Sequence, residues 1–145
     1  MSCLKVVINS LPFEVIEKEF SSRYEALVWI CKNQLGRRNL TPKQKKFLIG
    51  KQAKAEKQIR AFHGNQYTLA SESGLVQNEP DRTKHGSRSK IAAEHGTSES
   101  YVYRAEQFAK GVKAAEEAVP GAQEEILRGK IRATDREISS IAKVP

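Results

Sequence analysis

The spacing of apolar residues along the chain predicts a mainly α-helical protein with a short extended segment near its start. The stretches KVVIN and FEVIEKEF, at residues 5–9 and 13–20, flank the turn-like Ser10-Leu11-Pro12. Their β-branched and aromatic residues are typical of two short strands or a hairpin. From residue 21 onward, apolar residues recur mostly three or four positions apart, as on one face of a helix. The predicted fold class is therefore mainly α, with an α+β start.

Two helices are predicted in the N-terminal half. The first covers residues 23–35, is capped by one of the two serines before it, and ends at a left-handed Gly36. The second covers residues 42–61, with Thr41 as its cap and Pro42 in its first position. The apolar stripes consist of Tyr24, Leu27, Val28, Cys31 and Leu35 in the first helix and of Leu48, Ala55, Ile59 and Phe62 in the second.

The segment at residues 63–88 is predicted to be a flexible linker. It is rich in Gly, Ser, Asn and Gln and shows no sustained periodicity. The chain is thus divided into an N-terminal part at 1–62, the linker at 63–88 and a helical C-terminal domain at 89–145.

Several short helices are predicted after the linker. Breaks are expected at Gly96, at Pro120-Gly121 and at Gly129, and Thr134 with Glu137 forms a capping box. The predicted helices cover residues 89–95, 98–109, 112–119, 122–128 and 134 onward, the last burying Ile138, Ile141 and Ala142.

The stretch RSKIAAEHGTSESYVYRAEQFAKG, at residues 88–111, meets the requirements of a helix-turn-helix. Ala92 is a small residue at the position where a second helix would pack, and Gly96 follows four positions later for the turn. Ser98 can cap the second helix. The apolar contact between the two helices would come from Ile91, Val102 and Ala105. An αα-hairpin with a glycine turn would meet some of these requirements as well.

The outward face of the second helix is the predicted base-reading surface, because this helix enters the major groove in helix-turn-helix proteins. Arg104 is suited to a guanine or a phosphate, Gln107 to an adenine, and Tyr103 to a sugar-phosphate or a thymine methyl group. The predicted DNA-binding residues are Ser98, Ser100, Tyr103, Arg104 and Gln107 on this helix, Arg88 and Lys90 before it, and Arg37 and Arg38 in the N-terminal part.

The net charge of +8 comes from one segment. Residues 37–60 contain nine Lys or Arg and a single acid, Glu56, while the charges of the other segments cancel. Such a block attracts polyanions by releasing their counterions, but it is also typical of a solvated helix face. The arginines in the sequence Gly36-Arg37-Arg38-Asn39 fit either a phosphate site or a polar turn between helices.

The remaining reactive residue types form no catalytic or metal-binding pattern. The spacing of the histidines and cysteines matches no zinc motif, and the glutamates at 14, 17 and 19 have no nucleophile or metal partner. The residues concerned are His63, His85, His95, Cys3 and Cys31. Cys31, Trp29 and Phe47 are predicted to be core residues. We predict no metal, no cofactor and no enzymatic activity.

The hydropathy of the chain favours the cytoplasm. The sequence contains no apolar stretch long enough to span a bilayer, and MSCLKVVINS lacks the features of a secretory signal. We therefore expect a cytoplasmic, nucleoid-associated protein that does not bind a membrane.

The C-terminal part resembles the helix-turn-helix domain of ParB-type partition proteins. KIAAEHGTSESYVYRAEQFA is similar to the family's first helix, glycine turn and recognition helix, and EEILRGKIRATDREISSIAK to the segment that follows. GRRNLTPKQKKFLIGK is similar to the junction before the DNA-binding part, particularly in ParB-domain proteins of phages and bacterial mobile elements. The resemblance implies DNA binding in regulation, partition or maintenance of a plasmid, phage or other mobile element.

One departure from the family limits what the resemblance implies. ParB-type domains place a Gly-rich box with arginines, used for nucleotide and phosphate binding, upstream of their last N-terminal strand. Here about a dozen residues precede Phe13, and they contain no such box. The resemblance therefore implies a relative truncated at the N-terminus, without CTP hydrolysis or nuclease activity.

The predicted function is sequence-directed binding of duplex DNA by a homodimer or multimer, since small helix-turn-helix domains usually bind two half-sites. Three alternatives stay open: an adaptor whose basic helix docks an acidic protein, a nuclease of the ParB superfamily, and RNA binding through residues 37–60.

Overall fold

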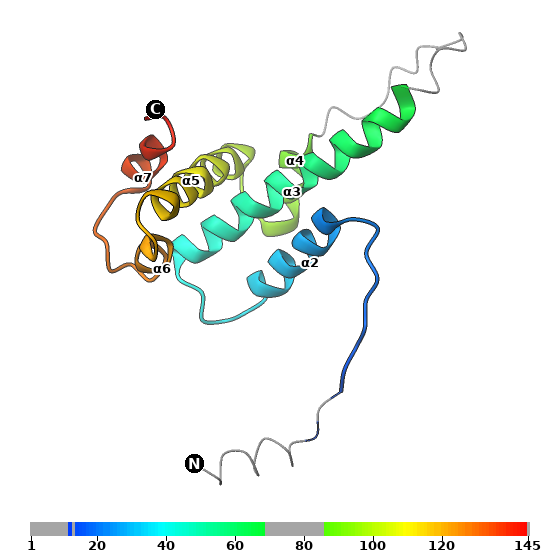
Figure 1. The fold of residues 1–145 in the computed structure, drawn as a ribbon, viewed down its shortest axis with the longest axis horizontal. Coiled ribbons are helices and arrows are strands. Elements are labelled where there is room, and N and C mark those ends of the chain that lie inside the picture. The colour runs from blue at the N-terminus through cyan, green and yellow to red at the C-terminus, as the bar shows by residue number, and fades with distance from the viewer. Residues whose placement is uncertain (1–11, 13, 69–85, 145) are drawn as a thin grey trace.

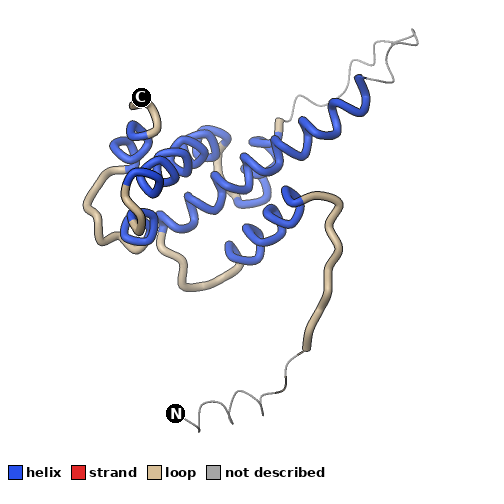
Figure 2. Tube along the Cα trace, viewed as in Figure 1, coloured by secondary structure: helices blue, strands red, loops and turns tan. Residues whose placement is uncertain are grey.

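The computed structural model describes residue 12, residues 14–68 and residues 86–144, with the side chains of 62–68 left out. This part of the chain forms helices connected by loops and contains no strand (Figure 2). The helices are α2 (Arg23–Leu35), α3 (Pro42–Thr68), α4 (Ser87–His95), α5 (Glu99–Ala118), α6 (Ala122–Leu127) and α7 (Asp135–Ile141). The predicted mainly helical fold is confirmed.

The strand predicted for residues 13–20 is not seen. Residues 14–20 form an irregular, exposed arm that leads into α2 (Figure 1). A strand needs a neighbour for its backbone N–H and C=O groups, and the described part of the chain offers none. The other predicted strand, at 5–9, lies outside the described residues.

Helix α3 is the centre of the fold. It runs antiparallel to α2 and also packs against α4, α5 and α6, while α7 packs on α5 (Figure 1). Phe47 of α3 belongs to a buried cluster with Phe108, Val112, Ala115, Ile126 and Ile138. A second cluster joins Ile49 and Ala53 of α3 to Ile91, Ala92, Val102 and Ala105. Both clusters therefore unite the predicted N-terminal part with the predicted C-terminal domain.

The buried surface of α3 is wider than the single predicted stripe. Within that stripe Ala55 is buried, Leu48 and Ile59 are half-buried, and the side chain of Phe62 lies outside the described residues. The structure also buries three apolar residues beside the stripe, namely Phe47, Ile49 and Ala53. The difference arises because α3 packs against both α2 and α5.

Local capping determines where the helices begin. Three predicted caps accept a hydrogen bond from the backbone N–H three residues later: Ser22, Ser98 and Thr134. At the start of α3, Gln44 N–H donates to Thr41 Oγ1 (3.1 Å) and Thr41 N–H donates to Gln44 Oε1 (2.9 Å). Thr41 Oγ1 also donates to the carbonyl oxygen of Leu127 (2.8 Å), which ties the start of α3 to the end of α6.

The boundaries around the predicted linker differ from the expectation. Helix α3 continues to Thr68, past its predicted end at residue 61 and into the segment expected to be linker, and α4 begins at Ser87. Gly36 ends α2 in a right-handed conformation, with φ of −72°, instead of the left-handed one expected. Composition alone placed the boundary at 62, but backbone helix hydrogen bonding continues beyond it.

Helix α5 is longer than predicted. It continues through Gly111 to Ala118, so the helix ending at 109 and the helix starting at 112 are one element. Gly111 is buried, and its Cα faces the backbone of Ile138 in α7. Packing on α7 thus maintains the helix across a residue with low helix propensity.

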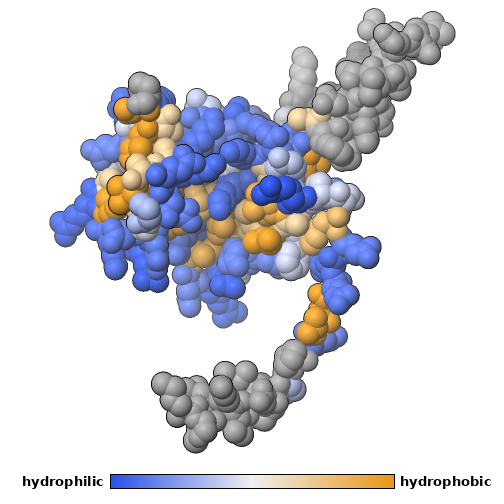
Figure 3. All heavy atoms as spheres, viewed as in Figure 1, coloured by the Kyte–Doolittle hydropathy of each residue, from blue (hydrophilic) through white to orange (hydrophobic). Residues whose placement is uncertain are grey.

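The core predictions were right for most residues and wrong for some. Cys31 and Phe47 are buried as expected, whereas Trp29 is 41% exposed and contacts Phe20 and Lys18 instead (ring centroids 5.9 Å apart; Lys18 Nζ 4.8 Å from the ring). In α7, Ile138 is buried but Ile141 and Ala142 are exposed, because only one face of this short helix meets α5. On the face shown in Figure 3, apolar surface is seen over α2, on the arm before it and near the end of α7.

Candidate nucleic-acid interface

Helices α4 and α5 are joined by a glycine turn, as the sequence predicts. Gly96 has φ of +62° and ψ of 35°, the left-handed conformation that side-chain-bearing residues adopt at a cost. The N–H of Thr97 donates to the carbonyl oxygen of Ala92 (2.8 Å), which closes the end of α4. Ser98 then begins α5 by accepting the N–H of Tyr101 at 3.1 Å.

The inward face of this helix pair is completely buried. Val102, Ala105 and Ile91 have no exposed surface, and Ala92 is 5% exposed. They pack with residues of α3 in a single cluster. Helices α3, α4 and α5 thus form a three-helix unit around one buried cluster.

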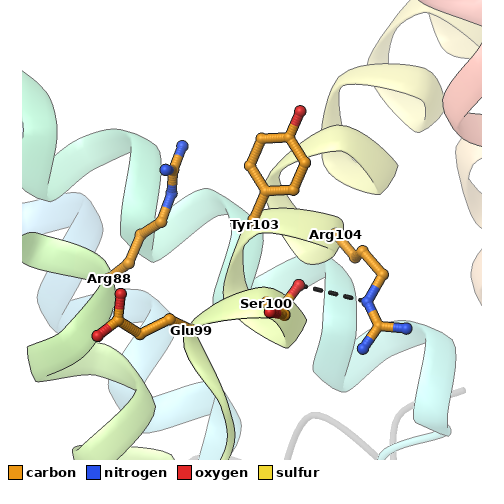
Figure 4. Close-up of a pocket in the computed structure, with 5 residues that line it drawn as sticks. All are labelled: Arg88, Glu99, Ser100, Tyr103 and Arg104. Carbon is orange, nitrogen blue, oxygen red and sulfur yellow. Dashed lines mark hydrogen bonds between the residues drawn. The ribbon is translucent and has the colours of Figure 1, made fainter.

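The outward face of α5 lies in solvent. Tyr103 is 49% exposed, and Glu99, Ser100 and Arg104 are exposed as well. Together with Arg88 of α4 they line a shallow hollow of about 420 Å³ (Figure 4). Arg104 Nε donates to the carbonyl oxygen of Ser100 at 3.3 Å, which holds its side chain along the helix. Three predicted base-reading residues therefore lie together on the first turns of α5.

The other two predicted DNA contacts of α5, Ser98 and Gln107, are less available to a ligand. The hydroxyl oxygen of Ser98 is occupied by its capping bond, so that side chain has a structural role in this structure. Gln107 is only partly exposed and does not line the hollow.

Arg88 is held by a carboxylate that sequence reasoning missed. Its Nε donates to Glu106 Oε1 (3.1 Å) and its Nη2 to Glu106 Oε2 (3.0 Å), while Lys57 Nζ lies 2.7 Å from Oε2. Glu106 is only 6% exposed. Burial alone would raise its pKa, but the hydrogen bonds from Arg88 and Lys57 outweigh that effect, so the pKa of Glu106 lies below its ordinary value. The hydrogen bond with Glu106 in turn raises the pKa of Arg88.

Arg88 also contacts the exposed face of α5. The guanidinium carbon of Arg88 lies 5.0 Å from the centre of the Tyr103 ring, a cation–π distance. In Figure 4 the two side chains run in the same direction from α4 and α5. The only sequence signal for Glu106 was that an acidic residue directly follows the inward Ala105 and, if buried, requires a cation.

Lys90, Arg37 and Arg38 do not join the hollow beside Tyr103. Lys90 instead lines a second, smaller hollow of about 190 Å³ between α2, α3 and α4, with Val28, Lys32, Glu56, Ile59 and Arg60. Arg37 and Arg38 are exposed in the connection between α2 and α3.

Much of the basic segment at 37–60 is engaged within the protein. Lys43 Nζ donates to the carbonyl oxygens of Ile131 (3.3 Å) and Ala133 (3.1 Å). Lys46 pairs with Asp135 at 2.7 Å. Lys57 pairs with Glu106, as described above. The ammonium group of Lys51 lies 4.8 Å from the ring centre of Phe47. The segment is therefore not one continuous free cationic face.

A polar network crosses the interface between α2, α3 and α4. Gln52, which has no exposed surface, donates through Nε2 to Glu56 (3.0 Å) and Glu94 (3.1 Å), and its Oε1 lies 2.9 Å from His95 Nε2. Lys32 pairs with Glu94 at 2.9 Å. Burial raises the pKa of Glu94, but hydrogen bonds from Lys32 and Gln52 bring it below its ordinary value. The network satisfies a buried amide and orients α4 on α3.

Neither a metal site nor a membrane span is found in the described part of the chain. Among the residues described, no three His, Cys, Asp or Glu side chains are placed to hold a metal ion. None of the described helices is long and apolar enough to cross a bilayer.

Comparison of the chain with models of known protein families, with curated proteins and with solved structures gave no match. The resemblance to ParB-type proteins therefore stays a prediction from the residues quoted above.

Proposed function

We propose that this protein binds duplex DNA in a sequence-directed manner and inserts the first turns of α5 into the major groove. The observation that carries the proposal is the division of α5 into two faces. Val102 and Ala105 are fully buried against α3 and α4, whereas Ser100, Tyr103 and Arg104 are exposed on the opposite side. A helix-turn-helix requires this division.

Each exposed side chain has a defined role in the proposal. The fork of Arg104 suits the two acceptors of a guanine or a phosphate, and the hydroxyl of Ser100 suits a base edge or a backbone oxygen. The Tyr103 ring suits a thymine methyl group or a sugar. Gln107 would reach a base only at the edge of the contact, because it is partly buried. The protein would act without a cofactor, as a homodimer or multimer on paired half-sites.

The likeness of residues 90–109 and 124–143 to ParB-type proteins supports a role in regulation, partition or maintenance of a mobile element. Under this proposal the protein uses a DNA-binding part similar to that of the ParB-type proteins and works in the cytoplasm on the nucleoid. The adaptor alternative is weakened because Lys43, Lys46 and Lys57 are bound to groups of the protein itself.

The test is selection of bound sequences from a random duplex library, carried out with the wild type and with Tyr103→Ala and Arg104→Ala. We expect the wild type to enrich one sequence, with affinity falling log-linearly with salt. The two variants should lose roughly tenfold to a hundredfold in preference for that sequence, the value of one base contact. Lys113→Ala is the matched control, because Lys113 is 67% exposed on the same helix and its ion-pair partner is the equally exposed Glu117.

Two outcomes would contradict the proposal. Enrichment of the same sequence by both variants would show that α5 is not the reading helix. Failure of the wild type to bind any duplex, at low salt and with the fold intact, would exclude DNA binding as the function. Nicking of supercoiled plasmid in the presence of Mg²⁺ would favour the nuclease alternative instead.

A further inference from the structure

One buried carboxylate joins the three helices of the proposed DNA-binding unit. Glu106 of α5 receives two hydrogen bonds from Arg88 of α4 and one from Lys57 of α3, all between 2.7 and 3.1 Å. Two cations against one carboxylate leave a net positive charge at this point. Lys57 alone would neutralise Glu106, so the charge of the carboxylate does not by itself require Arg88.

The geometry of the pair leaves one side of Arg88 available. The guanidinium uses Nε and Nη2 for Glu106, a side-on, two-point contact that fixes the plane of the group. Within the described residues, its Nη1 makes no hydrogen bond. The side chain remains 37% exposed, and it lies over Tyr103 at the edge of the hollow lined by Ser100 and Arg104. An arginine held in this way presents oriented donors next to the base-reading face.

We propose that Glu106 is a positioning residue that holds Arg88 so that its free guanidinium edge donates to a DNA phosphate beside the base read by Tyr103. This inference rests on the proposed function. In helix-turn-helix complexes the first helix of the motif crosses the sugar-phosphate backbone, and Arg88 lies in the first turn of that helix, α4. Fixing the fork in advance lowers the conformational entropy that is lost on binding.

The test is a double-mutant cycle on DNA affinity with Glu106→Gln, Arg88→Ala and the double variant. Each protein is titrated with the duplex selected by the wild type and with a random duplex. We expect Glu106→Gln to weaken binding on the order of tenfold, the effect of losing one charge-assisted hydrogen bond. The loss should be equal for both duplexes, because a phosphate contact carries no sequence information. In the Arg88→Ala background, Glu106→Gln should cause no further loss of affinity.

The sign of the change in DNA affinity distinguishes a positioning role of Glu106 from a purely electrostatic effect of its charge. Glu106→Gln removes a negative charge, which by electrostatics alone would tighten binding to DNA. Arg88→Ala should in addition lower the slope of log affinity against log salt by about one phosphate. Glu124→Gln is the control, because Glu124 pairs with Arg128 on the surface of α6, outside the three-helix unit.

Folding is monitored by thermal unfolding, and Arg88→Lys covers the case in which Glu106→Gln does not fold. Lysine keeps the charge at a partly exposed position but lacks the fork, so we expect a severalfold loss of affinity. Binding by Arg88→Lys equal to that of the wild type would overturn the inference. So would unchanged or tighter binding by folded Glu106→Gln, or an equal loss in both backgrounds. If the wild type binds no DNA, both the proposed function and the inference about Glu106 fail. If the wild type binds and these variants match it, the positioning role alone fails.

Discussion

Gly50 of α3 lies directly against the backbone of Ala105 in α5. A Cβ atom at position 50 would overlap the Ala105 carbonyl group and would lie 2.7 Å from its carbon and 2.9 Å from the Cβ of Ala109. Ala105 itself has no exposed surface. The absence of a side chain at 50 therefore sets how closely the proposed reading helix packs on the central helix.

We expect Gly50→Ala to lower the free energy of unfolding by roughly 3 kcal/mol or more, because a backbone group has to move to accept the methyl group. Denaturant unfolding measures the loss. The control is Gly36→Ala, since Gly36 has a right-handed φ of −72° and its nearest contact for a Cβ would be at 3.4 Å. Equal stability of the two variants would show that α3 and α5 do not meet at Gly50.

A second prediction concerns Lys43, which has a structural role in spite of its place in the basic segment. Its ammonium group donates to the carbonyl oxygens of Ile131 and Ala133, in the connection between α6 and α7. Lys43→Ala should lower stability by about 1 kcal/mol, because it leaves two carbonyl groups without their charged donor. Lys45→Ala, at an exposed position of the same helix, should change stability little. A similar small effect of both substitutions in thermal unfolding would contradict the assignment.

A third prediction concerns the dependence of stability on pH. The pKa of Glu106 lies below its ordinary value of 4.5 in the folded protein. The contribution of this group to stability is therefore complete above pH 4.5 and is lost as the pH falls through the lower folded pKa. The stability of the wild type should accordingly fall with decreasing pH from about pH 5 downward.

The measurement is the free energy of unfolding between pH 7 and pH 3 for the wild type and for Glu106→Gln. The variant should be less stable at pH 7, and the gap should narrow as the pH falls. Glu117→Gln, at a position where the side chain is 68% exposed, should follow the wild type throughout. A gap between wild type and Glu106→Gln that stays constant over this range would exclude the ion pairs as its source.

The features that were predictable from sequence are those encoded by neighbouring residues. Ser98, Gly96 and Thr134 determine helix ends through bonds within three to five positions, so their residue types were sufficient. The same holds for the burial of Val102 and Ala105, whose spacing matches one helix face.

The features that were missed depend on partners far along the chain. Gly111 continues α5 because α7 packs on it, and Arg88 is held by a carboxylate 18 positions later. From the sequence, Lys43 and Lys46 belong to a basic segment expected to face solvent or a polyanion. In the structure they bind groups of the protein that lie 88 to 90 positions away along the chain. No local pattern distinguishes such residues from solvated ones. The sequence therefore indicated which face of α5 is exposed more accurately than it indicated which lysines and arginines are paired within the protein.

The hydrogen bond between Thr41 and Leu127 spans 86 positions of the chain, and it has a consequence for the order of folding. The turn between α4 and α5 forms through local hydrogen bonds, whereas the buried face of α3 is complete only when its distant partners in α4, α5 and α6 are present. On the ribosome, α3 emerges long before α6 and α7 are synthesised. Phe47 and Ile49 then lack their partners in α4 and α5 until those helices have also emerged, and in this interval the nascent chain is exposed to aggregation and to chaperone binding.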